Sequence, residues 1–425
     1  MSFARFYRYD FAVTQIFTDA SMASKYYGIS ISAHLLSYTP ICVIQLLNQT
    51  KKPFFIDPMT FVFARDIENI SGDNGIRRSY KRLMEDYGPP FTICSSGTRL
   101  KPTAFQKPDG TIVDTIIAEV CKKVLNYQKT KCQIDTGFAK YAKLLKKKGY
   151  SNLQPLSPDF LVAPYFYAER HGDEWYNISL RFAEQARLLK GDARLYPVIC
   201  ISREGLFDKA KVLEIVKDYK GFDGYLIWVS DLNEQELFSS ELDGLKALIS
   251  GLSNYGKPVY SLYGGYLCDL LAKFGLQGYS SGICYGEKRS VDTQGGGAGK
   301  RYYIPTVHLK ISADLANAFY AVSDKNKRLL CKCPICSKIQ ADLPPLLSSN
   351  EYFDLFFHKM GFLDFRRHFV CVKSQEANTL AAQNPGQIVS SLEKDIAAIQ
   401  DIDRIPDHPQ QLEPRHLMVW RTLFK

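Results

Sequence analysis

The sequence has 425 residues, 46% of them hydrophobic and 13% aromatic, which is enough to bury a large core and excludes an intrinsically disordered chain. Its 54 Lys and Arg against 44 Asp and Glu give a net charge of +10, which favours an acidic partner such as nucleic acid. The odd number of cysteines, 11, and the lack of a signal peptide at the Met1 end predict a reducing, cytoplasmic location. No window approaches 18 uninterrupted apolar residues, so we expect no membrane partner.

The composition changes along the chain predict four regions. They are a packed N-terminal segment without clear period (1–40), a large α/β domain (41–311) with a basic insertion at about 68–156, a metal-binding subdomain (312–385), and a C-terminal tail (386–425). The apolar side chains of 417–424 are expected to dock this tail onto the rest of the protein.

Short apolar runs bounded by turn residues recur in the large domain, and such runs are typical of buried parallel strands. We predict eight of them, at 41–47, 53–58, 91–94, 160–167, 195–202, 224–230, 258–263 and 278–285. Amphipathic stretches that predict helices lie between most of them, at 175–189, 209–219, 234–252 and 266–274. The alternation predicts a (β/α)8 TIM barrel with its active site at the carboxyl ends of the strands; a doubly wound open sheet is the alternative.

Two polar segments interrupt this pattern. The basic insertion includes Arg77-Arg78 and the run Lys143–Lys148, and it predicts inserted helices and loops whose lysines form either a solvated face or phosphate contacts. The glycine-rich stretch Gly295–Gly299 lacks the Gly-Lys-Ser/Thr signature of a phosphate loop, so it predicts a linker.

Three cysteines lie within six residues of one another, in Cys331-Lys332-Cys333-Pro334-Ile335-Cys336. Thiolates at this spacing predict a structural Zn²⁺ site, with His368 as the fourth ligand of a tetrahedral Cys₃His set. His358 is the alternative fourth ligand, and three free cysteines in a loop are the alternative to a metal. The surrounding basic stretch, Lys325 to Lys338, favours the thiolates and suits a polyanion.

Three segments outside the metal loop resemble motifs of the guanine transglycosylase superfamily, whose members exchange guanine for a 7-deazaguanine. Ile56–Phe61 resembles its Thr-Asp-Ser-Gly-Gly-Phe/Tyr segment, Phe222–Tyr225 resembles the entry to its sixth strand, and Tyr260–Gly265 resembles its seventh-strand Tyr-Leu-Met-Gly-Val-Gly. The order of a barrel, a C-x-C-x₂-C loop and a helical pair with a histidine is also similar. The resemblance extends over roughly residues 50 to 375.

Two departures from the tRNA enzymes of that superfamily are clear. Tyr279-Ser280-Ser281 stands where they have Phe-Asp-Cys with the nucleophilic aspartate, and Pro164-Tyr165-Phe166 stands where they have a guanine-reading aspartate. The chain is therefore more similar to the divergent DNA-guanine transglycosylases, which install 7-cyano-7-deazaguanine or a relative in DNA. This resemblance implies DNA as the partner, with tRNA as the alternative, a free 7-deazaguanine base as co-substrate, and helper proteins that open the duplex as a further candidate.

Base exchange requires one carboxylate to attack the sugar C1′ and one to move protons at the departing and incoming bases. Asp57 and Asp231 each follow a predicted strand and would face the active-site end of a barrel. The resemblance implies that Asp57 is the general acid/base, and we infer Asp231 as the nucleophile. The alternatives are a turn residue before Pro58 for Asp57, and for Asp231 a helix N-cap with Glu234 at the capping-box position.

The substrate base also requires a binding surface. The resemblance implies that Phe61 stacks on it, although Phe61 is equally well explained as a core residue. Tyr165, Tyr167 and Glu169 are expected where the base edge is recognised, and Gly264 and Gly265 let the backbone approach the ligand. Because the usual nucleophile position holds Ser280, a non-catalytic barrel that binds nucleic acid as a partner subunit is the remaining alternative.

Overall fold

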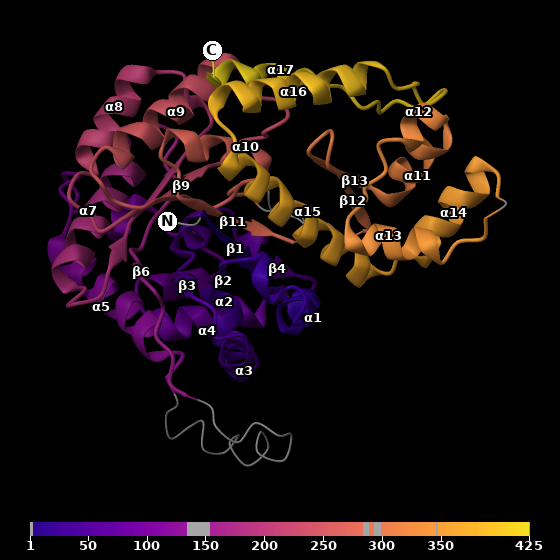
Figure 1. Ribbon diagram of the computed structural model, residues 1–425. Helices are drawn as coiled ribbons and strands as arrows, with labels where there is room; N and C mark the ends of the chain where they lie inside the picture. Colours follow the sequence, from indigo (N-terminus) through magenta and orange to yellow (C-terminus); the bar gives the residue numbers. More distant parts are fainter. Residues whose placement is uncertain (1–2, 134–153, 284–288, 293–298, 346, 425) are drawn as a thin grey trace.

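The computed structural model describes residues 3–133, 154–283, 289–292, 299–345 and 347–424 (Figure 1). Its centre is a curled, seven-stranded parallel sheet that forms a half-barrel, in the order β3-β2-β1-β11-β10-β9-β8. The strands are β1 (Ala4–Arg8), β2 (Gly28–Ser32), β3 (Phe54–Asp57), β8 (Val198–Ile201), β9 (Tyr225–Val229), β10 (Val259–Ser261) and β11 (Gly278–Gly282). The neighbours β1 and β11 come from opposite ends of the α/β region.

A short strand lies between the two edges of this sheet. β6 (Leu161–Val162) pairs in parallel with β7 (Leu195–Tyr196), which directly precedes β8 in the sequence. On its other side, the Asp159 N–H donates to the carbonyl of Phe54 in β3 at 2.8 Å. Aromatic rings fill the space that the strands enclose, with centroid separations of 4.1 to 5.8 Å along the series Tyr196, Phe160, Phe55, Phe6 and Tyr260.

Helices cover the outer face of the sheet, as expected for strands that are buried on both faces. They are α1 (Thr14–Thr18), α2 (Ala33–Tyr38), α3 (Pro40–Thr50), α4 (Arg78–Tyr87), α5 (Asp114–Thr130), α7 (Glu174–Leu189), α8 (Lys209–Asp218), α9 (Ser239–Ser253) and α10 (Tyr266–Leu271). The basic insertion between β3 and β6 supplies α4, α5 and the small hairpin of β4 (Ser71–Gly72) and β5 (Gly75–Ile76).

The C-terminal region begins with an antiparallel hairpin, β12 (Arg301–Ile304) and β13 (Leu309–Ser312), and continues as helices. These are α11 (Ala313–Ala321), α12 (Asp324–Lys327), α13 (Pro334–Ala341), α14 (Ser349–Lys359), α15 (Phe362–Ala382), α16 (Pro385–Gln400) and α17 (Arg415–Arg421). The long α15 connects this region to the sheet (Figure 1), since Phe369 packs on Tyr7 of β1 and Arg5 donates to the carbonyl of Lys373.

The tail docks as its apolar residues predict. Leu417 and Trp420 of α17 are fully buried, and the indole Nε1–H of Trp420 donates to the carbonyl of Glu234 at 3.0 Å. None of the helices in the described ranges is long and apolar enough to cross a lipid bilayer.

Three sequence predictions about the strands are wrong. Residues 1–40 are not an irregular segment, because they supply β1 and β2 at the middle of the sheet. The run 41–47 lies in helix α3, which starts with Pro40 at its first turn and buries Val43, Ile44, Leu46 and Leu47. A short apolar run has no period that separates a buried strand from a buried helix. The run 91–94 is part of a 3₁₀ turn that ends at Gly97, where φ is +83°.

The remaining predicted runs contain strands. Those at 53–58, 160–167, 195–202, 224–230, 258–263 and 278–285 correspond to β3, β6, β7 with β8, β9, β10 and β11. The lysine run Lys143–Lys148 and residues 295–298 of the predicted linker lie outside the described residues.

Candidate functional site

Cys331, Cys333, Cys336 and His368 form a buried cluster whose ligand atoms all lie within 4.8 Å of one another. Nδ1 of His368 is 3.3 Å from Sγ of both Cys333 and Cys336. A tetrahedral zinc ion with Zn–S and Zn–N bonds of about 2.3 and 2.05 Å places such atoms about 3.6 Å apart. The cluster is therefore compatible with a zinc site, because a small local adjustment reaches the ideal geometry.

The elements around the cluster orient its ligands. Cys333 is the N-cap of α13 and Cys336 lies in its first turn, while α15 presents His368. The Nε2–H of His368 donates to the carbonyl of Tyr303 at 2.7 Å, which leaves Nδ1 free to bind a metal. The imidazole also stacks on the Tyr302 ring, with centroids 4.4 Å apart. By contrast, His358 is exposed on α14 and lies outside the cluster.

The three thiols differ in how readily they ionise. Hydrogen bonds from Cys331 and Cys336 lower the pKa of Cys333, so this thiol ionises first. The hydrogen bond that Cys331 donates to Cys333 raises the pKa of Cys331 to about 12, and the hydrogen bonds that Cys336 donates to the other two cysteines raise the pKa of Cys336. A metal ion bound here would replace the thiol protons, and its positive charge would offset the repulsion between three thiolates this close together.

A second group of polar residues lies at the carboxyl ends of the parallel strands. We call Arg8, Asp57, Tyr165, Tyr263 and Arg289 the strand-end cluster. Asp57 ends β3 and is fully buried; its Oδ2 accepts from Nη1 of Arg8, which ends β1, at 3.2 Å. Its Oδ1 accepts from the hydroxyl of Tyr165 at 2.9 Å and from the N–H of Met59 at 3.1 Å. Both oxygens of Asp57 therefore have hydrogen-bond donors within the protein.

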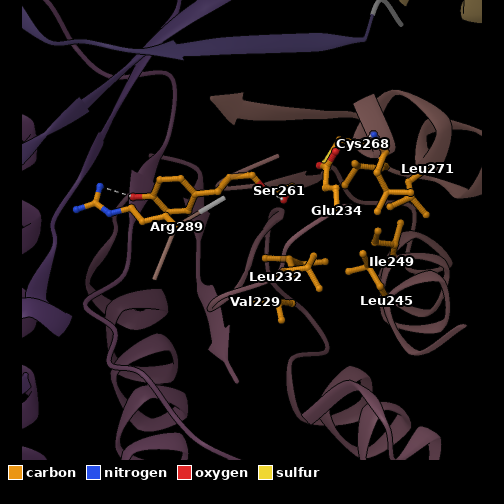
Figure 2. A pocket seen from close by; sticks show the side chains of 13 residues that line it. Val229, Leu232, Glu234, Leu245, Ile249, Ser261, Cys268, Leu271 and Arg289 are labelled. Carbon is orange, nitrogen blue, oxygen red and sulfur yellow. Dashed lines mark hydrogen bonds between the residues drawn. The ribbon is translucent and has the colours of Figure 1, made fainter. Parts of the chain in front are cut away.

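Tyr263 joins the two arginines of the strand-end cluster. The guanidinium of Arg8 lies 4.5 Å from the centre of the Tyr263 ring and that of Arg289 lies 5.3 Å from it. Arg289 also donates from Nη1 to the Tyr263 hydroxyl at 2.8 Å (Figure 2). Burial, Arg289 and Arg8 lower the pKa of the nearby His34 to about 3, so this imidazole is neutral and adds no positive charge.

Aromatic rings surround the cluster. Phe61 is fully buried, stacks on Tyr165 with centroids 5.6 Å apart, and meets the edge of Trp228 at 4.6 Å. Burial, followed by the charge of Asp57, raises the pKa of Tyr165 well above its ordinary value, so its phenol stays protonated and donates. Because it is buried between Tyr165 and Trp228, Phe61 packs as a core residue, and its ring forms part of the aromatic wall beside Asp57.

Asp231 lies in a different hydrogen-bond network from Asp57. It is exposed, has a φ of +61°, and its Oδ2 accepts from the hydroxyls of Ser230 at 2.8 Å and Ser290 at 3.1 Å. Its N–H donates to the carbonyl of Arg289 at 3.3 Å, so Arg289 links Asp231 to the strand-end cluster. The alternative of a helix N-cap is excluded, because the next helix, α9, begins only at Ser239.

Other predicted substrate residues are placed apart from Asp57. Tyr167 is half-buried under the guanidinium of Arg65, 5.0 Å from the ring centre, and Glu169 is exposed. Gly264 packs internally, since a Cβ there would lie 2.1 Å from Sγ of Cys268. Glu234, beside Cys268 in Figure 2, accepts from the Gly265 N–H at 2.6 Å and so occupies the N-terminus of α10.

Sequence reasoning missed the arginines of the strand-end cluster. Arg8 lies in the segment predicted to be irregular, and its only signal is the short apolar run of β1 that it ends. Arg289 lies seven residues after the end of β11 and belongs to no recognisable motif. Ser280 stands where the transglycosylases that the sequence resembles have their nucleophile. Its hydroxyl is buried and forms a hydrogen bond with the hydroxyl of Ser30 at 2.7 Å.

No model of a known protein family matches this chain, and no curated protein matches it.

Proposed function

We propose that this protein is a base-exchange transglycosylase that replaces guanine in DNA by a 7-deazaguanine, such as 7-cyano-7-deazaguanine. The observation that carries the proposal is the buried Asp57 carboxylate, held by Arg8 and Tyr165 beside a wall of aromatic rings at the carboxyl ends of parallel strands. An ionised acid next to flat rings suits a reaction in which a flipped base is held and a proton is moved.

We also propose that the half-barrel is part of a complete (β/α)8 barrel in which β6 is the closing strand between β3 and β7. The parallel pairing of β6 with β7 and the Asp159–Phe54 hydrogen bond support this arrangement. In such a barrel the carboxyl ends of the strands form the catalytic face, which is where Asp57 and Asp231 follow their strands.

The proposed chemistry divides the work between the two aspartates. Asp231 attacks C1′ of the deoxyribose, the bond from C1′ to the guanine nitrogen breaks, and guanine leaves with the bonding electron pair and takes up a proton. The incoming deazaguanine then attacks C1′, displaces Asp231 and gives up a proton to the Asp57 carboxylate. The departing guanine takes its proton from water, and the proton that Asp57 accepts from the incoming deazaguanine passes to the hydroxide so formed, so the exchange is balanced and Asp57 is again a carboxylate.

The continuity between the two networks supports this division. Asp57 pairs with Arg8, Arg8 lies over Tyr263, Tyr263 accepts from Arg289, and the Arg289 carbonyl accepts from the N–H of Asp231. We propose that the Cys₃His cluster holds one structural Zn²⁺, which would fix the loop of Cys331–Cys336 against α15 and take no part in the exchange.

The test is incubation of the protein with labelled guanine and either duplex DNA or tRNA. The expected result is label in DNA, with its release when unlabelled 7-cyano-7-deazaguanine is added, much slower labelling by the Asp57→Asn variant and no labelling by Asp231→Asn. Label in tRNA alone would make the protein a tRNA-guanine transglycosylase.

A second candidate is a non-catalytic subunit that binds nucleic acid. The burial of Ser280 and its bond to Ser30 favour it, because no carboxylate replaces the usual nucleophile on that strand. Label in neither nucleic acid, with tight binding to one of them, would support this candidate.

A further inference from the structure

A groove of about 560 Å³ lies between the metal-binding loop and the helices α15 and α16. One wall is the segment Arg328–Cys333, which leads into the Cys₃His cluster, and the other includes Glu376 of α15 and Asp395 of α16. Tyr266 lines the groove as the first residue of α10, three residues after Tyr263 of the strand-end cluster. The groove therefore reaches from the metal loop to the first residue of α10.

Three cations of the groove have no side-chain partner among the residues that the structure describes. The exposed side chains of Arg328, Lys332 and Lys394 make no hydrogen bond, ion pair or ring contact with any described residue. Together they place three positive charges along both walls, two from the metal loop and one from α16.

The carboxylates of the same lining are paired within the protein. Glu376 accepts from Tyr303 at 2.9 Å, pairs with Nδ1 of His308 at 2.7 Å and with Nζ of Lys373 at 3.1 Å. Asp395 pairs with Nε2 of His308 at 3.4 Å. Because the acids are paired within the protein and three cations are not, the groove carries a positive potential towards solvent.

We infer that this groove binds the sugar–phosphate backbone of one strand of duplex DNA, next to the nucleotide that the strand-end cluster acts on. The inference rests on the proposed function for the identity of the nucleic acid. A row of unpaired cations in an open polar groove suits a chain of phosphates, which lose their counterions when Lys and Arg replace them. The contact is to the backbone, so it positions DNA without reading its sequence.

The test compares two triple variants in full-length protein. The first is Arg328→Gln with Lys332→Gln and Lys394→Gln. The matched control is Lys217→Gln with Lys220→Gln and Lys257→Gln, three exposed lysines that lie near the amino ends of β9 and β10, away from the strand-end cluster. Fluorescence anisotropy of a labelled duplex of about 30 base pairs, enough to span the protein, gives the affinity at several salt concentrations, and a tRNA arm is measured in parallel.

The groove variant should bind duplex DNA up to about 10²-fold more weakly at about 0.1 M salt, with a plot of log affinity against log salt that is less steep by about 2 to 3. The control variant should keep the affinity and slope of the wild type, and all three proteins should show equal melting temperatures and metal contents. An unchanged slope in the groove variant, an equal loss in the control, or a loss confined to tRNA would overturn the inference.

The two proposals fail separately. If wild-type protein exchanges labelled guanine into DNA and the groove variant binds DNA as tightly as wild type, the base-exchange function stands and the inference that the groove binds DNA is wrong. If the groove variant loses affinity for DNA and neither wild type nor variant exchanges label, the inference that the groove binds DNA stands and the base-exchange function is wrong.

Discussion

Replacement of Asp57 by Asn should destabilise the protein as well as slow its chemistry. The Asp57 side chain is fully buried, and its partner Arg8 is only 12% exposed. Asn keeps the shape of Asp and can still accept from Tyr165 and Met59, but it removes the negative charge that faces Arg8. A position facing the active-site end of a barrel would leave Asp57 accessible to solvent, but in the structure the side chain is buried.

The size of the effect follows from the pair. Removal of one partner of a buried ion pair costs about 3–5 kcal/mol, because the other charge remains buried without compensation. The two retained hydrogen bonds place Asp57→Asn near the lower end, at about 3 kcal/mol. The matched control is Asp231→Asn. Asp231 is exposed with a φ of +61°, and Asn tolerates this left-handed conformation, so the expected change is below about 0.5 kcal/mol.

Urea unfolding followed by tryptophan fluorescence measures both changes, since Trp228 lies against the aromatic wall of the site. A further variant, Asp57→Asn with Arg8→Met, removes the unpaired guanidinium and should be more stable than Asp57→Asn alone. If Asp57→Asn unfolds at the same urea concentration as wild type, or if the added Arg8→Met lowers stability further, the reasoning about the buried pair is refuted.

Three further predictions concern the metal, the pH dependence and the nucleophile. Reduced protein should contain one zinc per chain by elemental analysis; His368→Ala should lose it and the exposed His358→Ala should keep it, and the reverse would move the ligand to α14. Burial alone would lower the pKa of His308, but Glu376 and Asp395 outweigh it and raise the folded-state pKa above the ordinary value of 6.5. The stabilisation is therefore complete below about pH 6.5 and is lost as pH rises through the raised pKa, so melting temperatures should fall over that range in wild type and not in His308→Gln; equal pH profiles would contradict this. Asp231→Asn should form no covalent protein–DNA adduct, whereas Asp57→Asn should slow exchange by roughly 10²–10⁴-fold; full exchange by Asp231→Asn, with loss in Ser280→Ala or Glu287→Gln, would return the nucleophile to the last strand or the segment after it.

The sequence by itself determined the features that depend on neighbouring residues. Three cysteines within six positions can converge on one ion whatever the rest of the fold does, and these cysteines lie together in the structure. Apolar runs such as that of β9, flanked by turn residues, are buried on both faces and form parallel strands. Asp57 and Asp231 were predicted as site residues in the same way, because each is an acidic residue that follows such a run.

The tertiary structure decided what depends on distant residues. The β1 strand lies between β2 and β11, and β11 comes from the far end of the α/β region, so no local pattern could show that 1–40 belongs to the sheet. Arg8 meets Asp57 only because β1 and β3 end at the same edge, with β2 between them. His368, and not His358, lies in the cysteine cluster because α15 brings Nδ1 of His368 within 3.3 Å of two thiols and its Nε2 to the Tyr303 carbonyl. Burial and pairing are properties of the assembled neighbours, and a sequence pattern contains only the residues next along the chain.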